Sequence, residues 1–247
     1  MEVDVYTTRF YRKWTRTGAL RRFRVRNGSS DLEIAAGFDC TETACRLLRR
    51  ARRAVEDRIG RDPHFGTSLA PLPVLGDEPE PVASMLRAGR DWDVGPMAAV
   101  AGAIAGFVGR GLASRGPVIV ENGGDIYARG PGELVVRLYA GEESPFGRCV
   151  EFCVDASDGV GICTSSGRVG PSLSLGLADA VTVVADSPAA ADAAATAIAN
   201  RVASSADVEG AVGAAAAADS VRGALACCGG RMAVWGLRLP VPEGGGC

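Results

Sequence analysis

The chain has 247 residues with 27 basic and 29 acidic side chains, a net charge of −2 at pH 7, so a whole-molecule attraction to nucleic acid is not expected. Lys13 is the only lysine and His64 the only histidine, which leaves no well-placed residues for a Ser-His-Asp triad, a multi-histidine metal site or a P-loop. Any chemistry must therefore come from carboxylates, hydroxyls, thiols, arginines, backbone dipoles or a bound cation.

The cysteines do not follow a disulfide or zinc pattern. Cys40, Cys45 and Cys163 fall inside predicted helix or strand, Cys227 and Cys228 are adjacent, and no Cys-x-x-Cys pair occurs. The first fourteen residues carry charges throughout and contain no apolar signal segment. We therefore expect a cytoplasmic protein with free, mostly buried thiols.

The N-terminal part of the chain predicts strands. Apolar and polar residues alternate over 3–10 and 20–26, which is typical of half-exposed strands. The sequence Asn27-Gly28-Ser29-Ser30 is a hairpin signal, and 31–37 is the expected return strand.

A helix is predicted next. Asp39-Cys40-Thr41-Glu42 has the residues of a capping box, and an apolar stripe runs from Ala44 to Ile59. Its many arginines would then face solvent. Such a face could contact nucleic acid, but a solvated helix face is the simpler interpretation, and we expect no nucleic-acid partner.

A Pro-rich connection over 63–81 and a short helix over 81–90 lead to the most apolar part of the chain. Pro96 is suited to the first position of a helix that continues to Val108. This run is short for a membrane span, and its Gly and Ala content favours close packing in a core. We expect a central buried helix whose N-terminal amides favour an anion, and no membrane segment.

The stretch Pro117–Gly130 organises the rest of the chain. Val118 to Val120 predict a short buried strand that enters the turn Asn122-Gly123-Gly124, followed by Asp125. The turn is a good hairpin turn, and by itself that is its simplest interpretation. Its lack of side-chain bulk would equally let a ligand approach the backbone, with Asp125 facing a metal, a hydroxyl or a ring nitrogen.

The C-terminal half predicts further strands at 133–139, 148–154, 160–164 and 178–185, with a last one at 231–235. The third of these runs into the hydroxyl- and glycine-rich loop Ser165-Ser166-Gly167, which is suited to phosphate or ribose oxygens. The Ala-rich segment 203–218 is expected to be helical.

The segment after Asp186 predicts a helix with Ser187 at its N-cap and Pro188 at its first position. Asp192 and Thr196 are four residues apart and so project from one face. Together they could offer hard oxygen ligands to Mg²⁺. Alternatively, Thr196 bonds to its own backbone and Asp192 points at solvent.

Taken in order, four segments resemble the ApbE-like superfamily, and nearest a cytoplasmic, functionally uncharacterised branch of it. They are the helix Pro96–Ala103, Glu121-Asn122-Gly123-Gly124-Asp125, Thr164-Ser165-Ser166-Gly167 and Ala191–Thr196. The best-known members of the superfamily are flavin transferases, which move FMN from FAD to a protein threonine. The resemblance covers nearly the whole chain.

The resemblance implies a site. It implies that Gly123, Gly124 and Asp125, with Ser165, Ser166 and Gly167, border a flavin nucleotide. It also implies that Mg²⁺ is held by three groups, namely the Asp192 and Thr196 side chains and the backbone carbonyl of Ala98.

This chain lacks some residues of the flavin transferase pattern, which puts transferase activity in question. Flavin transferases carry an Asp before the apolar helix and a Lys-Gly within it, where this chain has Gly95 and Ala101-Gly102. Their Asp-Pro-x-x-Gly segment is absent between Gly130 and Gly161. No catalytic residue is therefore assigned.

The expected fold is α+β, with sheets packed against helices around a central apolar helix. We expect one ApbE-like domain over 1–240, with two sub-lobes meeting near 90–117 and the site in the cleft between them, and a disordered tail over 241–247. The expected function is binding of FAD or another nucleotide with Mg²⁺ and transfer or hydrolysis at its phosphate linkage. The alternative is a nucleotide-binding or interaction protein without catalysis.

Overall fold

The structure is a computed structural model that describes residues 20–74, 76–139, 149–167 and 176–239. The strand expected at 3–10 and the tail expected at 241–247 lie outside these residues. So do residues 168–175, which follow the predicted Ser165–Gly167 loop.

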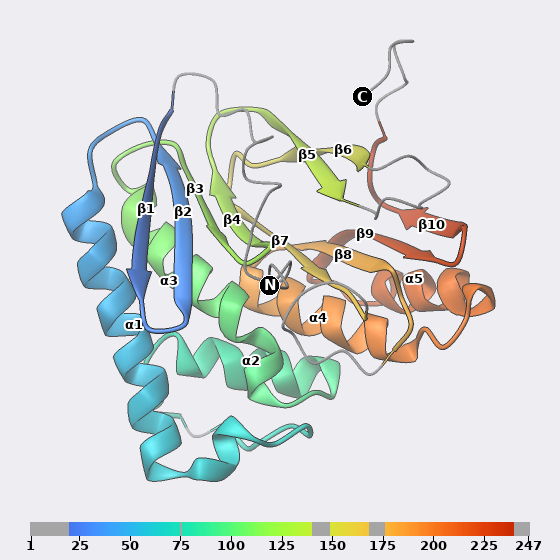
Figure 1. Cartoon of the computed structure of the whole chain (residues 1–247), viewed down its shortest axis with the longest axis horizontal. Helices are drawn as coiled ribbons and strands as arrows, with labels where there is room; N and C mark the ends of the chain where they lie inside the picture. Colours follow the sequence, from blue (N-terminus) through green and yellow to red (C-terminus); the bar gives the residue numbers. More distant parts are fainter. Residues whose placement is uncertain (1–19, 75, 140–148, 168–175, 240–247) are drawn as a thin grey trace, which may run out of the picture.

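A single antiparallel sheet of eight strands forms the centre of the fold, in the order β1-β2-β3-β4-β7-β8-β9-β10 (Figure 1). Most of its strands carry β-branched or aliphatic residues at buried positions, as strands of a covered sheet do. Their bounds are β1 Arg21–Asn27, β2 Ser30–Ala36, β3 Val118–Asn122, β4 Asp125–Arg129, β7 Val160–Ser165, β8 Ala180–Ala185, β9 Val221–Cys228 and β10 Arg231–Trp235.

Helices cover one face of this sheet and a two-stranded hairpin packs on the other (Figure 1). The hairpin consists of β5 Glu133–Tyr139 and β6 Cys149–Asp155. The helices are α1 Thr41–Arg61, α2 Val82–Trp92, α3 Val100–Ala113, α4 Pro188–Arg201 and α5 Val208–Ala216, with 3₁₀ turns at Pro63–Gly66, Pro96–Ala99 and Ser205–Asp207. The expected α+β architecture is confirmed.

The apolar helix predicted after Pro96 is the central helix of the core. Its first turn is 3₁₀, and α3 then packs against α1, α4, β3 and β4. Among the described residues, Pro96–Ala113 is the one helical segment apolar and long enough to cross a membrane, but most of it is buried inside the fold. It therefore has the burial expected of a core helix.

Glycines allow α3, α4 and β7 to approach one another closely. A Cβ on Gly102 of α3 would lie 2.3 Å from the carbonyl oxygen of Pro188, and one on Gly161 of β7 would lie 2.4 Å from the Cα of Pro188. Only a residue without a side chain fits at these two contacts. Through these two contacts the start of α4 packs tightly between the central helix and the sheet. The position of Asp192, one turn further along α4, is determined by this packing.

The capping box predicted at 39–42 is not formed. Helix α1 starts at Thr41 with Cys40 at the N-cap, and no side chain caps it. Asp39 lies one residue too early, and its carboxylate accepts a 3.3 Å hydrogen bond from the Thr41 N–H instead. A thiol at the N-cap is a weak acceptor, so the helix start is fixed by packing.

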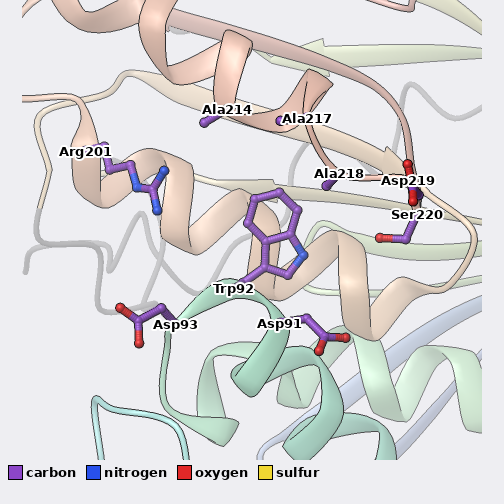
Figure 2. Close-up of a pocket in the computed structure, with 9 residues that line it drawn as sticks. All are labelled: Asp91, Trp92, Asp93, Arg201, Ala214, Ala217, Ala218, Asp219 and Ser220. Carbon is purple, nitrogen blue, oxygen red and sulfur yellow. The ribbon is translucent and has the colours of Figure 1, made fainter.

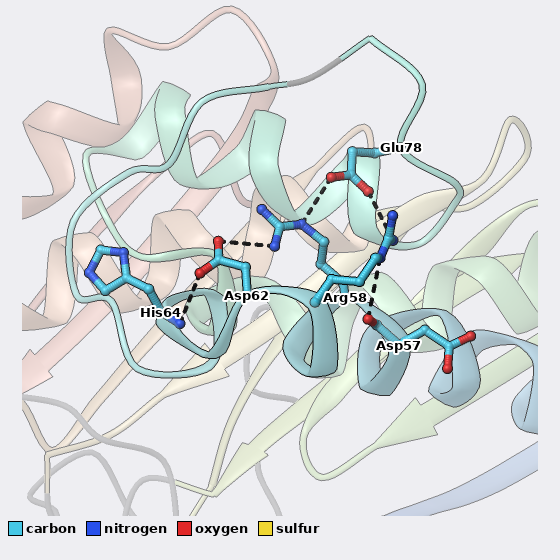
Figure 3. Close-up of polar contacts among 6 residues, drawn as sticks. Asp57, Arg58, Asp62, His64 and Glu78 are labelled. Carbon is cyan, nitrogen blue, oxygen red and sulfur yellow. Dashed lines mark hydrogen bonds and ion pairs between the residues drawn. The ribbon is translucent and has the colours of Figure 1, made fainter.

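The arginines of α1 do not all face solvent. Arg58 is 8% exposed, and its guanidinium donates to Glu78 at 2.9 Å and to Asp62 at 3.0 Å (Figure 3). It also stacks 4.9 Å from the centre of the Phe65 ring. This cluster fastens the Pro-rich connection to the end of α1, so the connection is held in place by a buried ion pair.

One further prediction needs correction, and one strand was not predicted. The helix expected over 203–218 is shorter, because a 3₁₀ turn at Ser205–Asp207 precedes α5. Strand β9 had no sequence prediction, although it is paired on both sides, between β8 and β10. Its sequence Val-Arg-Gly-Ala-Leu-Ala-Cys-Cys is largely buried on both faces and therefore lacks the polar alternation that marks a half-exposed strand.

Candidate functional site

The start of α4 carries the first element of the candidate site. The Ser187 hydroxyl accepts a 3.2 Å hydrogen bond from the Ala190 N–H, so the predicted cap is formed. One turn later, Oδ2 of Asp192 accepts a 2.8 Å hydrogen bond from the backbone N–H of Gly102. The anion expected at the start of the central helix is therefore supplied by the protein itself, and Asp192 does not simply point at solvent.

Asp125 lies on the same face of the sheet as these helices. Tyr127, two residues further along β4, packs on Gly109 of α3, and side chains two residues apart in a strand share a face. Asp125 is 8% exposed, and its Oδ1 atom has no hydrogen-bond partner among the described residues. A buried acceptor without a partner is costly, so this atom marks a place where a ligand or ion would be satisfied.

The two carboxylates influence each other. Burial raises the pKa of Asp125 well above its usual range, and the nearby charges of Asp192 and Glu121 raise it further, while the Cys163 thiol and the Thr164 backbone lower it. Burial also raises the pKa of Asp192 to about 7, against the opposing effect of the Gly102 and Ala101 N–H groups. Among the described residues, no arginine or lysine is a cause of either shift, so no described cationic side chain offsets the charge of this pair.

Cys163 is opposite Asp125 in the sheet. The register Ile126 with Ile162 and Tyr127 with Gly161, extended by one residue, pairs Asp125 with Cys163. The thiol donates a 3.3 Å hydrogen bond to the Pro188 carbonyl, and burial followed by the charge of Asp125 raises its pKa well above the usual value. A thiol held in the neutral form is a poor nucleophile, so Cys163 is a packing residue here.

The predicted Asn122-Gly123-Gly124 turn is a tight hairpin turn between β3 and β4. Gly123 and Gly124 have φ values of 73° and 104°, which favour glycine. The Gly124 N–H donates to the Glu121 carboxylate at 2.9 Å, and the Asn122 side-chain amide donates to the Ala101 carbonyl at 3.1 Å. The turn is therefore tied to the start of α3.

Glu121 and Asn122 are site-region residues whose contacts the sequence did not predict. Both are largely buried, Glu121 accepts its bond from Gly124, and the contact of Asn122 is to helix α3, about twenty residues earlier in the chain. Their one sequence signal was polarity at the end of a buried strand, directly before the Gly-Gly pair.

The Ser165-Ser166-Gly167 loop leaves the end of β7 beside this turn. Ser165 follows Cys163 by two residues and so shares its helix-facing side, and its hydroxyl makes no hydrogen bond within the described residues. The Ser166 hydroxyl donates to the Asp179 carbonyl at 2.7 Å, and the Gly167 N–H donates to the Ala178 carbonyl at 3.0 Å. Ser165 is thus the residue of this loop with an uncommitted hydroxyl.

Thr196 and Ala98 complete the set expected around a cation. Thr196 lies one turn after Asp192 on α4 and is partly exposed, and the Pro96–Ala99 turn that contains Ala98 packs against α4. In the described part of the chain no three His, Cys, Asp or Glu side chains are grouped so as to hold a metal. A cation here would therefore depend on backbone, hydroxyl and ligand oxygens besides carboxylate, and the assignment stays a prediction.

Two pockets among the described residues lie away from this site. One is formed by α2, α4 and α5, and the other lies near Pro117 and Leu134. None of the predicted site residues lines either pocket. The carboxylate pair lies instead at the packed junction of α3, α4, β4 and β7.

This arrangement of sheet, hairpin and helices is the fold of ApbE-like proteins. The apo form of the flavinyl transferase ApbE of Pseudomonas stutzeri matches 87% of this chain and 93% of its own, with a TM-score of 0.50 and 13% identity. The ApbE protein of Thermotoga maritima matches 87% of this chain and 96% of its own, with a TM-score of 0.54 and 12% identity. At such identities the likeness concerns the fold alone.

Sequence comparison gives the family. A family model described as AbpE bacteria matches residues 12–230, and the chain belongs to this family. It is 42% identical over 168 residues to the UPF0280 protein of Methanopyrus kandleri, covering 68% of each chain. It is 37% identical over 212 residues to that of Methanothrix thermoacetophila, covering 84% of this chain and 88% of the relative. The predicted ApbE-like kinship is confirmed.

Proposed function

We propose that this protein binds a flavin nucleotide, or a closely related nucleotide, together with Mg²⁺ at the α3–α4–β4–β7 junction. The proposal includes action at the phosphate linkage of that nucleotide. The observation that carries it is the pair of neighbouring carboxylates formed by buried Asp125 and partly buried Asp192, whose charges no cationic side chain among the described residues offsets.

The residues at this junction suit a hard divalent cation. Two close buried carboxylates repel each other unless one is protonated or a cation lies between or beside them. Oδ1 of Asp125 has no partner, and the Thr196 hydroxyl makes no hydrogen bond within the described residues. Mg²⁺ commonly takes one or two protein carboxylates and completes its shell with water and substrate phosphates, which fits a site without a third acidic residue.

The predicted residues would divide between holding the cation and contacting the nucleotide. Asp192 and Thr196, with the Ala98 carbonyl, would hold the cation, which when bound neutralises phosphate charge. The Gly123-Gly124 turn leaves the backbone uncovered for the nucleotide, and the free Ser165 hydroxyl would contact its oxygens. Asn122, through its bond to the Ala101 carbonyl, keeps the turn and the start of α3 at a fixed separation.

The reaction consistent with ApbE-like relatives is cleavage of the FAD pyrophosphate. The bond from the FMN phosphorus to the bridging oxygen breaks, a bond from that phosphorus to an acceptor hydroxyl forms, and AMP leaves. The acceptor is a protein threonine or water, and the proton of that acceptor is released to solvent. FAD is a cytoplasmic metabolite, so a cytoplasmic location would give the protein access to this substrate. That location remains a prediction.

A ligand panel tests the proposal. The melting temperature of the full chain is measured with FAD, FMN, ADP and ATP, each with Mg²⁺ or with EDTA. We expect at least one nucleotide to raise the melting temperature in Mg²⁺ only, because a ligand that binds the folded state stabilises it. Asp192→Asn should abolish this increase, whereas Asp158→Asn, at an exposed position away from the site, should retain it. No increase with any nucleotide would overturn the proposal.

A second function, nucleotide binding without turnover, is favoured by one specific observation. The family pattern has a lysine where this chain has Ala101, and among the described residues no positive side chain affects the pKa of either carboxylate. Chromatography of FAD incubated with protein and Mg²⁺ separates the two functions. AMP release supports the enzyme, and a saturable melting shift without AMP release supports the binding protein.

A further inference from the structure

A pocket at the C-terminal end of α2 is separate from the carboxylate pair. It has a volume of about 470 Å³ and lies between the C-terminal end of α2, the end of α4 and α5 (Figure 2). No residue of the candidate nucleotide site lines it. Whatever this pocket binds is therefore independent of the proposed function.

Trp92 lies at the centre of this pocket with an unused hydrogen-bond donor. Its side chain is 8% exposed, yet its indole N–H donates no hydrogen bond within the described part of the chain. Figure 2 shows the ring between α4 and α5, with its nitrogen on the side of Ser220. A nearly buried indole normally finds an acceptor, so the pocket has room for an oxygen atom supplied from outside.

Opposite charges stand on either side of the indole. Figure 2 places the guanidinium of Arg201 on one side of Trp92 and the carboxylate of Asp219 on the other. Neither side chain forms an ion pair with any described residue, whereas the nearby Arg222 pairs with Asp186 at 2.6 Å. Asp93 also lines the pocket without an ion pair to any described residue, and Figure 2 places it on the Arg201 side of the indole. The pocket thus offers one uncommitted arginine at one end, with Asp93 on the same side, and the uncommitted carboxylate of Asp219 at the other end.

The wall between these charges is mostly apolar. Ala214, Ala217 and Ala218 of α5 and the residues after it line it together with the indole. A ligand that suits this surface has a small apolar body, an acceptor near its middle, and opposite charges at its ends. Short peptides with free termini have these features, since an extended tripeptide spans roughly 10 Å and carries carbonyl acceptors between its charges.

We propose that this pocket binds a short peptide with free termini and small apolar side chains. Its carboxylate pairs with Arg201, its ammonium with Asp219, and a peptide carbonyl accepts the hydrogen bond of the Trp92 indole. The alanine wall admits small side chains and leaves little room for large ones. Asp91 already pairs with Arg90 at 2.8 Å and so contributes less to the ammonium.

Isothermal titration calorimetry with trialanine tests this inference on the full chain. We expect saturable binding, and at least fivefold weaker binding for N-acetyl-trialanine and for trialanine amide, each of which lacks one terminal charge. Arg201→Gln and Asp219→Asn should each weaken trialanine binding to a similar extent. Both residues are exposed, so these variants should keep the wild-type melting temperature.

Matched controls make the outcome decisive. Arg231→Gln removes an exposed arginine of β10 and should leave the affinity for trialanine unchanged. Trp92→Phe keeps an aromatic ring but removes the N–H, and should weaken binding without preventing folding. Equal binding of free and capped peptides, unchanged binding in Arg201→Gln, or no binding of dialanine, trialanine and tetraalanine would overturn the proposal.

Discussion

The backbone N–H of Gly102 donates a 2.8 Å hydrogen bond to the carboxylate of Asp192, ninety residues further along the chain. This bond joins the start of the central helix to the start of α4. It also shows why Gly102 is glycine, because a Cβ at this position would lie 2.9 Å from the Cβ of Asp192 and 2.3 Å from the Pro188 carbonyl oxygen.

Gly102→Ala should therefore destabilise the protein by about 2–4 kcal/mol, since backbone atoms must move apart to admit the methyl group. The same change in an open helix does the reverse. Gly213 of α5 has nothing within 4 Å of its Cβ position, so Gly213→Ala should stabilise by about 0.5–1 kcal/mol. Urea denaturation of both variants measures the contrast, and wild-type stability of Gly102→Ala would contradict the packing described.

The raised pKa of Asp192 predicts a falling stability as the pH rises. Its folded-state pKa is about 7, whereas an unfolded aspartate titrates near ~3.9. Between these values the folded chain binds more protons than the unfolded chain, so the free energy of unfolding decreases with pH. The full effect is about 4 kcal/mol at most, and less here because Asp192 is partly exposed and titrates together with Asp125.

Denaturation of wild type and Asp192→Asn between pH 4.5 and 8 measures this effect. The variant has no carboxyl group to titrate at position 192, so its stability should gain on that of the wild type as the pH rises. Asp158→Asn should follow the wild-type curve. Parallel curves for wild type and Asp192→Asn would show that Asp192 is not held in a protonated form by burial.

Local signals in the sequence predicted local structure well. The Ser187 cap, the Asn122-Gly123-Gly124 turn and the apolar helix after Pro96 each depend on residues next to one another, and each is present. The capping box before α1 failed because Cys40, and not Asp39, occupies the N-cap. Residue types near the start of a helix indicate that a cap can form, but packing determines which residue occupies the N-cap position.

The contacts within the site could not be predicted from local sequence. They depend on the register between paired strands and on close packing between segments far apart in the chain. That Asp125 faces Cys163 follows from the pairing of β4 with β7, which no single segment specifies. That Asp192 bonds to the start of α3 follows from two glycine contacts with Pro188. Strand β9 was missed because a strand buried on both faces and rich in Ala, Gly and Cys carries no period-two pattern.

Asn122 should stabilise the site region through its bond to the Ala101 carbonyl. It is 6% exposed, and Asn122→Ala would leave that carbonyl without its 3.1 Å partner. We expect a loss of about 1–3 kcal/mol in the free energy of unfolding. Chemical denaturation measures it, and Ser114→Ala, at an exposed position after α3, should change stability by less than about 0.5 kcal/mol. A neutral Asn122→Ala would mean that the turn and α3 are not coupled.

Arg58 and Arg53 of α1 provide a matched test of buried against exposed ion pairing. The Arg58 and Glu78 side chains are 9% and 5% exposed, and the Arg53 and Asp57 side chains are 84% and 63% exposed. Arg58→Ala leaves the Glu78 carboxylate buried without its main partner and removes the stacking on Phe65, so we expect a loss of about 3–5 kcal/mol. Arg53→Ala should cost no more than about 0.5 kcal/mol.

Because the Arg58 side chain holds the Pro-rich connection against the end of α1, limited proteolysis should cut residues 67–80 faster in Arg58→Ala than in Arg53→Ala. Equal stability and equal cleavage of the two variants would mean that the buried pair does not hold this connection.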